Sequence, residues 1–399
     1  MQIKSFGWNF KFTLHTALDK KIHILYLCSW FPNKYIPFLG NFVENHAFSI
    51  ANTCTVSCLY VRANLELSEQ VYQVDYRRKE GVDGWVVYYR NSNNILVKTW
   101  RYIQSHYLGR KLAIARNGKV DILHLHVIKP AGFIAYLWNM AQRIPFMVTE
   151  HSTAYLEMNR EKMGFTERYL VKKVLEQAQL VTVVSAHLGE NLKAFGKIKK
   201  MEVLNNVVDS QHFFPDDKKD DSFFTFIHIS TLVEEHKNAG GIIRAFSKLT
   251  KEVNHTRLWI ISDGDFSYCK HLAQTLELSE KISFMGPLES MEVAEKLRQS
   301  HCLVLFSNYE NMPVVISEAW MCGIPVISSD VGGIREHVKP INGLLIKPGD
   351  EEGLLQAMKR MIEDKNKYDS AQISEGAKKE FSSLAVGIKL KKYYLDILG

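Results

Sequence analysis

The chain has 399 residues, of which 46% are hydrophobic and 23% are charged, a composition that excludes a disordered chain and suits two or three folded domains. Its net charge of +7 is uneven, because residues 1–200 carry 27 Lys and Arg against 14 Asp and Glu, whereas residues 201–399 carry 23 against 29. No run of about 18 apolar residues occurs, so no membrane-spanning helix is expected, and residues 1–20 lack the apolar segment of a secretory signal.

Short apolar runs alternate with helical patterns in the first half of the chain. Residues 23–28 read HILYLC and are continuously apolar, as in a strand of a buried parallel sheet. A helix is predicted next, at residues 42–51. The alternation then continues with strands predicted at residues 54–61, 121–126, 145–149 and 180–184. This order predicts a doubly wound parallel sheet.

The all-charged segment at residues 216–221 interrupts the pattern and is predicted to be an exposed linker. A second series of elements follows it. Strands are predicted at residues 225–229, 257–262, 281–285, 302–306 and 325–328, and helices at residues 239–250, 291–299, 314–322 and 352–363. The fold class is therefore α/β with two Rossmann-like halves. Because open sheets bind ligands at the carboxyl ends of their strands, we expect the site in a cleft between the domains.

The segment 306–319 reads as the end of a buried strand, a polar loop and a helix with Pro313 at its first position. Free backbone N–H groups at this helix start favour an anion. Glu310 precedes the helix, and Glu318 lies five residues past Pro313, roughly 8 Å along the axis. The two carboxylates suit hydroxyls at opposite ends of one extended ligand. An equally good interpretation from these residues alone is that Glu310 favours the helix dipole and Glu318 is a surface residue.

Further motifs follow these glutamates: GIPVI at residues 323–327, GGIRE at 332–336 and NGLL at 342–345, with VLNNVVD upstream at 203–209. The whole pattern resembles the retaining GT-B glycosyltransferases of family 4 and covers nearly the entire chain. The resemblance implies an acceptor-binding domain at residues 1–208 and a donor-binding domain at 209–383, with a last helix at about 384–399 that packs back on the first domain. It also implies transfer of a sugar from a nucleoside-diphosphate sugar to an acceptor hydroxyl, in cell-surface polysaccharide or glycolipid synthesis.

The resemblance assigns roles to individual residues. Glu310 is expected to contact the donor sugar and Glu318 the ribose, while His151 lies near the donor sugar and Lys237 on the diphosphate. Glu310, His151 and Lys237 are thus the expected catalytic residues. The donor-binding residues are expected to include Gly40, Thr231, Gly264, Asn311, Met312, Pro313, Val314 and Glu318.

This chain departs from the family at two of these positions. Thr231 stands where the family has an arginine that pairs with the lysine on the diphosphate. Gly264 remains from a Gly-x-Gly-Pro turn whose first glycine and proline are missing. Neutralisation of the phosphates is therefore expected to depend on Lys237 and on backbone amides.

The first domain supplies the acceptor side of the predicted cleft. Gly40 allows the backbone to approach a phosphate closely, and Asn41 and His126 are expected to face the acceptor. His124 and His126 share one face of a strand, but no third ligand is evident, so both are interpreted as packed, hydrogen-bonded residues. Because Lys237 and helix-terminal amides are expected to stabilise the diphosphate, neither a metal nor another cofactor is expected.

Three other functions stay open. The first is a sugar-nucleotide epimerase on the same fold, and the second is a non-catalytic, sugar-nucleotide-binding partner subunit. The third is an NAD-dependent oxidoreductase, which the absence of a Gly-x-Gly-x-x-Gly fingerprint argues against.

Charge and cysteine content bear on location and partners. The basic clusters at residues 77–79, 172–173 and 197–200, with aromatic residues near Trp30, favour an anionic membrane surface and a sugar or lipid-linked sugar acceptor over nucleic acid. The six cysteines lie mostly in apolar runs without paired zinc-ligand spacing, as in a reducing compartment. The expected location is the cytoplasm, with peripheral attachment to the inner face of the cell membrane.

Overall fold

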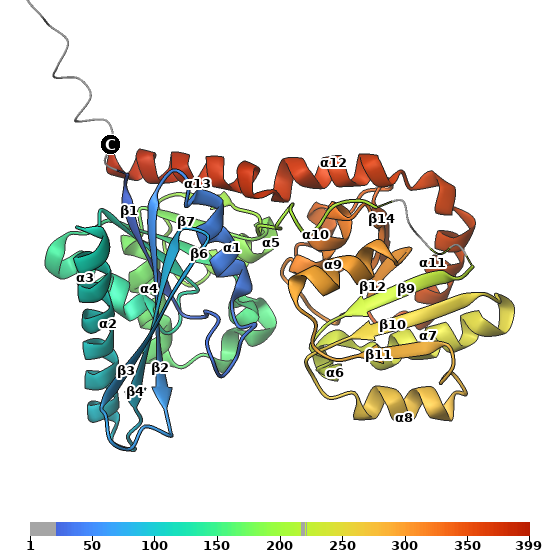
Figure 1. The fold of residues 1–399 in the computed structure, drawn as a ribbon, viewed down its shortest axis with the longest axis horizontal. Coiled ribbons are helices and arrows are strands. Elements are labelled where there is room, and N and C mark those ends of the chain that lie inside the picture. Colours follow the sequence, from blue (N-terminus) through green and yellow to red (C-terminus); the bar gives the residue numbers. More distant parts are fainter. Residues whose placement is uncertain (1–20, 217–219, 221) are drawn as a thin grey trace, which may run out of the picture.

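Residues 21–216, 220 and 222–399 are described by the computed structural model of the protein, in which two α/β domains lie side by side (Figure 1). Predictions about residues 1–20 lie outside this range, and the predicted linker at 216–221 lies mostly outside it. Within the described ranges, none of the helices is long and apolar enough to cross a membrane.

The first domain contains an eight-stranded sheet with the order β3-β4-β2-β1-β5-β6-β7-β8. Its strands are β1 (His23–Cys28), β2 (Thr55–Asn64), β3 (Tyr72–Lys79), β4 (Val82–Arg90), β5 (Ile122–His126), β6 (Phe146–Glu150), β7 (Leu180–Val183) and β8 (Met201–Val203). All neighbours are parallel except β3 and β4, which form an antiparallel hairpin at one edge. The predicted parallel sheet is confirmed, and the hairpin is an addition to it.

Helices cover both faces of this sheet, which explains the continuous apolar sequence of β1. Leu25 and Leu27 enter a core shared with α3 and α4, whereas Ile24 and Tyr26 enter a separate core shared with α1 and α13. The helices of the first domain are α1 (Asn41–Ile50), α2 (Ile95–Asn117), α3 (Gly132–Gln142), α4 (Phe165–Gln177) and α5 (Ala186–Lys193), with short 3₁₀ turns at Thr153–Tyr155 and Glu157–Lys162.

The second domain contains a six-stranded parallel sheet with the order β11-β10-β9-β12-β13-β14. Its strands are β9 (Phe224–Ile229), β10 (Thr256–Ile261), β11 (Ile282–Met285), β12 (Cys302–Leu305), β13 (Val326–Ser329) and β14 (Gly343–Ile346). Its helices are α6 (Glu234–Lys237), α7 (Ala239–Glu252), α8 (Ser267–Thr275), α9 (Ser290–Arg298), α10 (Val314–Met321) and α11 (Glu351–Glu363). The strand order reverses between β9 and β12, so the loops after these two strands border the crevice in which such sheets bind ligands.

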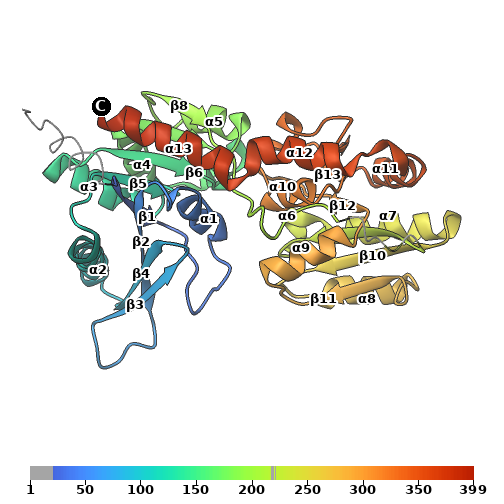
Figure 2. The ribbon, with the colours of Figure 1, turned by 45° about the horizontal axis from the view of Figure 1, so that its top comes forward.

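Two consecutive helices, α12 (Ser370–Phe381) and α13 (Ser383–Leu398), run along one side of both domains (Figures 1 and 2). α12 packs on α10 in the second domain, and α13 packs on α1 in the first. Ser382 joins them in an extended conformation and caps α13 through a hydrogen bond from the Ala385 amide. The hydroxyl of Tyr394 on α13 lies 3.0 Å from that of Tyr26 and 2.7 Å from Nδ1 of His124. The last helix is therefore part of the first core.

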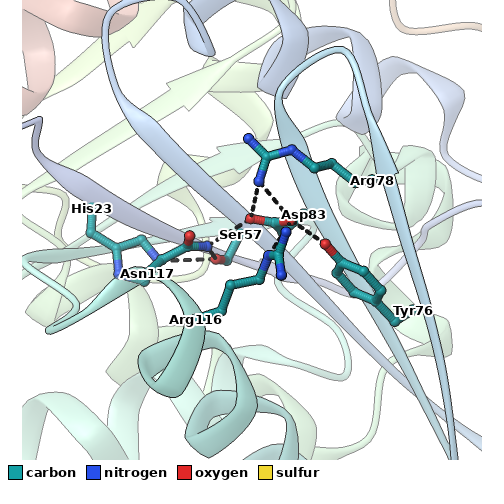
Figure 3. Close-up of polar contacts among 7 residues, drawn as sticks. All are labelled: His23, Ser57, Tyr76, Arg78, Asp83, Arg116 and Asn117. Atoms are coloured by element: carbon teal, nitrogen blue, oxygen red, sulfur yellow. Dashed lines mark hydrogen bonds and ion pairs between the residues drawn. The ribbon is translucent and has the colours of Figure 1, made fainter.

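Asp83, in β4, fixes the edge hairpin to the rest of the first domain (Figure 3). Its buried carboxylate accepts hydrogen bonds from Tyr76 Oη at 2.6 Å, from Asn117 Nδ2 at 2.8 Å and from Arg116 Nε at 2.9 Å. Arg78 pairs with the same carboxylate at 3.3 Å. Burial alone raises the pKa of Asp83, but these hydrogen bonds and charges outweigh it and hold the pKa below its ordinary value.

Replacing Asp83 by alanine is expected to lower the free energy of unfolding by about 3 kcal/mol, because two arginines and a tyrosine lose their shared acceptor. Asp75→Ala, on the same hairpin, is the control, since it removes an exposed 3.6 Å pair with Lys34 and should cost less than about 1 kcal/mol. Because the folded pKa of Asp83 is lowered, its contribution is complete above the ordinary aspartate pKa and is lost as pH falls through the folded value. Denaturant titrations at several pH values measure both effects, and equal losses for the two variants would contradict this role for Asp83.

Candidate active site

A cleft of about 880 Å³ lies between the two domains and is the largest of the described cavities. Gly40 and Asn41, at the start of α1, line its first-domain side. Val314 and Glu318, on α10, line its second-domain side. The cleft thus brings together four residues that were expected at the site from the sequence.

Gly40 occupies a position that only glycine fills without strain. Its φ of 72° lies in the left-handed region, and an added Cβ would lie 2.7 Å from both the carbonyl carbon and the oxygen of Trp30. No side chain caps α1, which begins at the next residue. The positive end of this helix is therefore open to an anion on the cleft side.

Glu310 and Lys237 meet where the loops after β9 and β12 come together. Lys237 Nζ donates to Glu310 Oε1 at 2.5 Å, and Ser307 Oγ donates to the same oxygen at 2.9 Å. The two loops are also joined through Asn308, whose amide donates to the carbonyl of His236. Glu310 is only 8% exposed, so its carboxylate is held in one orientation by a lysine and a serine.

Glu318 lies further along α10 and points into the same cleft. Its side chain is partly buried, and burial raises the pKa of its carboxyl to about 7. No hydrogen-bond donor among the described residues contacts its carboxylate. Both carboxylate oxygens of Glu318 are thus open acceptors, whereas Oε1 of Glu310 is taken by Lys237 and Ser307.

The start of α10 differs by one residue from the prediction. Pro313 is the N-cap residue, with φ −63° and ψ 129°, and the helix begins at Val314. Proline avoids an unpaired N–H at the cap just as it would at the first helical position. The helix start still borders the cleft through Val314, whereas Met312 is buried.

Two pairs of hydrogen bonds join the second domain to the first, one at the loop before α10 and one at the turn after β13. Asn311 Nδ2 donates to the carbonyl of His151 at 2.6 Å, and Asn206 Nδ2 donates to the carbonyl of Met312 at 3.3 Å. The carboxylate of Glu336 accepts from the amides of Ala186 and His187 at the start of α5, at 2.8 and 2.9 Å. Sequence reasoning missed the roles of Asn206 and Glu336, although both lie in motifs that it singled out.

The glycine pair of the GGIRE motif makes these contacts possible. A Cβ on Gly332 would lie 1.9 Å from the carbonyl oxygen of Glu310, and one on Gly333 would lie 2.2 Å from Cβ of Ser185. The motif therefore lets the turn after β13 pack closely against both the Glu310 loop of the same domain and Ser185 of the first domain. A Cβ on Gly264 would likewise lie 2.2 Å from the carbonyl oxygen of Thr231, so the turn after β10 packs on the loop after β9.

His151 and His126 lie on the first-domain side. The ring of His151 packs on that of Phe42, at 4.2 Å between centroids, beside the cleft. His126 is fully buried and does not line the cleft, which differs from the expectation that it faces the acceptor. Burial lowers the pKa of both rings well below the ordinary histidine value, so they are neutral.

Glu150 orients the loops that carry these histidines. Its buried carboxylate accepts from the amides of Ile128, His151 and Ser152, at 2.8 to 2.9 Å. Burial raises its pKa to about 7, and the three amide hydrogen bonds oppose that shift. No sequence signal identified Glu150, because its partners come from backbone atoms of two separate loops.

Two family models together match most of the chain. The model described as Glycosyltransferase Family 4 matches residues 55–212, and the one described as Glycosyl transferases group 1 matches residues 209–380. The boundary between the two matches falls at the segment that joins the domains.

Several characterised proteins are similar in sequence. N-acetyl-alpha-D-glucosaminyl L-malate synthase of Bacillus anthracis is 28% identical over 307 residues, which cover 73% of this chain and 79% of the relative. Lipopolysaccharide 1,6-galactosyltransferase of Salmonella typhimurium is 26% identical over 297 residues, covering 69% of this chain and 79% of the relative.

Solved structures share the arrangement of both domains. Sucrose-phosphate synthase from Thermosynechococcus elongatus has a TM-score of 0.74 at 17% identity, covering 94% of this chain and 98% of the other. The Anabaena protein Alr3699/HepE, solved in complex with UDP and glucose, has a TM-score of 0.70 at 17% identity, covering 94% of this chain and 100% of the other. At this level of identity the likeness establishes the fold alone.

Replacing Gly40 by alanine is expected to destabilise the protein by about 2–5 kcal/mol, because the left-handed backbone and the clash with Trp30 add. Gly81→Ala is the matched control, since Gly81 has a similar φ of 81° but its Cβ would meet only Ala51 Cβ at 3.5 Å. The control should therefore show only the conformational cost, about 1–2 kcal/mol. Denaturant unfolding measures the difference, and its absence would mean that the Trp30 contact is not a constraint.

Proposed function

The chain belongs to glycosyltransferase family 4, whose two domains the matched models span and whose GT-B fold the structure has, and we propose that it transfers its sugar with retention of anomeric configuration. The donor is a nucleoside-diphosphate sugar, and the reaction serves polysaccharide or glycolipid synthesis. The observation that carries the assignment of residues is that Glu318 lines the cleft from α10, while Glu310 and Lys237 meet on the loops beside the start of that helix.

The donor is proposed to lie along α10 and the loop that precedes it. Glu318, with its open acceptor, takes the ribose hydroxyls, and the diphosphate lies over the starts of α1 and α10. Glu310 takes hydroxyls of the donor sugar. When the diphosphate attracts Lys237, Ser307 still holds the Glu310 carboxylate in place at 2.9 Å.

Departure of the leaving group places negative charge on the diphosphate. Lys237 and the amides at the helix starts stabilise that charge from fixed positions, which is the kind of electrostatic preorganisation that lowers a barrier most. In retention without a covalent intermediate, the acceptor hydroxyl attacks from the side of the leaving group, and a phosphate oxygen takes its proton. Glu310 is not assigned as a nucleophile, because attack by the acceptor from the side of the leaving group needs no covalent intermediate.

Two alternatives make distinct predictions in the same assay. A sugar-nucleotide epimerase would release free sugar without any acceptor, and a non-catalytic partner subunit would bind nucleotide without turnover. The named relatives that match along two thirds of the chain or more are transferases and synthases that use sugars, which favours transfer. The nucleotide in the HepE complex makes UDP the first probe for binding.

Glu310→Gln is expected to abolish transfer while UDP or another cognate nucleoside diphosphate still binds, whereas Glu318→Gln should weaken binding about 10–150-fold through loss of charged hydrogen bonds. Because burial raises the pKa of Glu318 to about 7, nucleotide binding to the native protein should tighten as pH rises through that value. Calorimetry at several pH values, paired with a transfer assay, tests both parts. Native turnover in both variants, or a pH dependence that persists in Glu318→Gln, would refute the assignment.

Lys237→Ala is expected to lower the turnover rate about 10–150-fold, the value of one charged hydrogen bond in a dry cleft. Lys248→Ala, on an exposed face of the same domain, is the control and should retain native turnover. We further propose that Lys237 replaces a divalent ion on the diphosphate, so Mg²⁺ or Mn²⁺ added to buffer freed of both ions should not stimulate transfer. A strict requirement for either ion would overturn this part.

We also propose peripheral attachment to an anionic membrane through the first domain, with a lipid-linked acceptor. The cluster at residues 77–79 contributes little to this, because Arg77 pairs with Glu44 and Arg78 with Asp83. The segment 197–200 keeps more of its charge exposed, and each basic residue near such a surface contributes about 1 kcal/mol.

Glutamate substitutions at Lys197, Lys199 and Lys200 are expected to reduce co-sedimentation with anionic vesicles at low salt. The same substitutions at Lys172 and Lys173, which pair with Glu176, serve as the control and should have a smaller effect. Equal, negligible binding of the native protein to anionic and neutral vesicles would remove the membrane from the proposal and favour an acceptor free in solution.

A further inference from the structure

Three histidines from three different elements meet behind the wall of the cleft. His46 lies on α1, His126 ends β5 and His151 follows β6. Each offers a ring nitrogen that lies within 4.8 Å of the nitrogens offered by the other two. His46 and His126 are completely buried, and His151 is partly buried against Phe42.

The three rings carry nitrogen atoms without hydrogen-bond partners in the part of the chain that the structure describes. Neither nitrogen of His126 has a partner, and Nδ1 of His46 and Nε2 of His151 also have none. Buried polar side-chain atoms are nearly always paired in folded proteins. Unpaired nitrogens on three neighbouring rings therefore indicate a ligand that the rings share.

The hydrogen bond of His46 determines which of its two ring nitrogens is free to bind a ligand. Nε2 lies 3.1 Å from the backbone oxygen of Asn205, and a carbonyl oxygen can only accept, so Nε2 carries the hydrogen. Nδ1 of the neutral ring then carries a lone pair and can act as a metal ligand. Histidines that bind metals commonly donate their second N–H to a backbone carbonyl in this way, which fixes the orientation of the ring.

His124, two residues before His126 on the same strand, behaves differently. Its Nδ1 lies 2.7 Å from the Tyr394 hydroxyl, and its Nε2 lies 2.6 Å from the Thr149 hydroxyl. The interpretation of both strand histidines as packed, hydrogen-bonded residues therefore applies to His124 and not to His126. The two histidines that lie near His126 are His46 on α1 and His151 directly after β6, and the spacing of the sequence does not reveal that they meet.

We propose that His46, His126 and His151 form a binding site for a transition-metal ion of the Zn²⁺ type. Imidazole nitrogens suit Zn²⁺, Ni²⁺ and Cu²⁺, whereas Mg²⁺ and Mn²⁺ prefer oxygen ligands. A tetrahedral zinc ion with nitrogens at about 2.0–2.1 Å places them about 3.3 Å apart, so the rings need to approach by no more than about 1.5 Å. Three histidines leave a fourth position for a small ligand. This site is separate from the groups assigned to the diphosphate, but it includes His151, which the sequence predicted to lie near the donor sugar.

Metal content of the full-length protein tests the proposal. The purified protein is loaded with ZnCl₂, desalted and measured by mass spectrometry for bound zinc, and the apoprotein is titrated with Co²⁺ as a visible-light probe of the coordination geometry. The native protein and His124→Gln should retain equimolar zinc and show tetrahedral Co²⁺ bands. His126→Gln and His151→Gln should retain only background zinc and show none.

Folding of each variant is checked by circular dichroism, and zinc should raise the melting temperature of the native protein and of His124→Gln alone. His151→Gln keeps the test decisive if the fully buried His126→Gln fails to fold, because the ring of His151 is partly exposed. Background zinc in the native protein, or equal zinc in the native protein and a folded His151→Gln variant, would overturn the proposal.

Discussion

The ion pair between Lys237 and Glu310 is the contact on which the arrangement of the second domain depends. It joins the loops that follow β9 and β12, the two neighbouring strands at which the strand order of the sheet reverses. Lys237 is held through α6 and Glu310 through the loop before α10, so the pair also sets where α10 begins. Both charges lie in a largely desolvated position, where one of them alone would be costly. The loops beside the start of α10 therefore carry a charge pair that a bound anion can share.

Around this pair, the domains approach closely through backbone atoms. Gly332 and Gly333 leave room for the Glu310 loop and for Ser185, and Asn311 and Asn206 then bridge to carbonyl groups across the gap. One apolar cluster includes buried residues of both domains, among them Leu25 of β1 and Leu303 of β12, so the domains also share apolar packing.

The sequence predicted best where a single local pattern determined the structure. β1 was predicted with its observed bounds, because both faces of that strand are covered and residues 24–28 are all apolar. The hairpin of β3 and β4 was missed, because the exposed face of β3 is polar and its pairing depends on Asp83, whose partners are far apart in sequence. Among site residues, Glu310, Glu318 and Gly40 followed from motifs, whereas Glu150 and His46 act through tertiary contacts that no spacing reveals.

The return of α13 to the first domain means that this domain is not a continuous stretch of chain. One of its two cores includes Val386, Leu390 and Tyr394, which follow the entire second domain in sequence. A ribosome therefore delivers the second domain before the first has its last helix, and the face of the sheet that carries α1 stays uncovered during that interval. Synthesis of the first domain therefore begins first but ends last, because its final helix follows the second domain in sequence. The second domain is the one that can finish folding first. Any exchange of donor domains between related chains would have to carry this helix with the first domain rather than with the second.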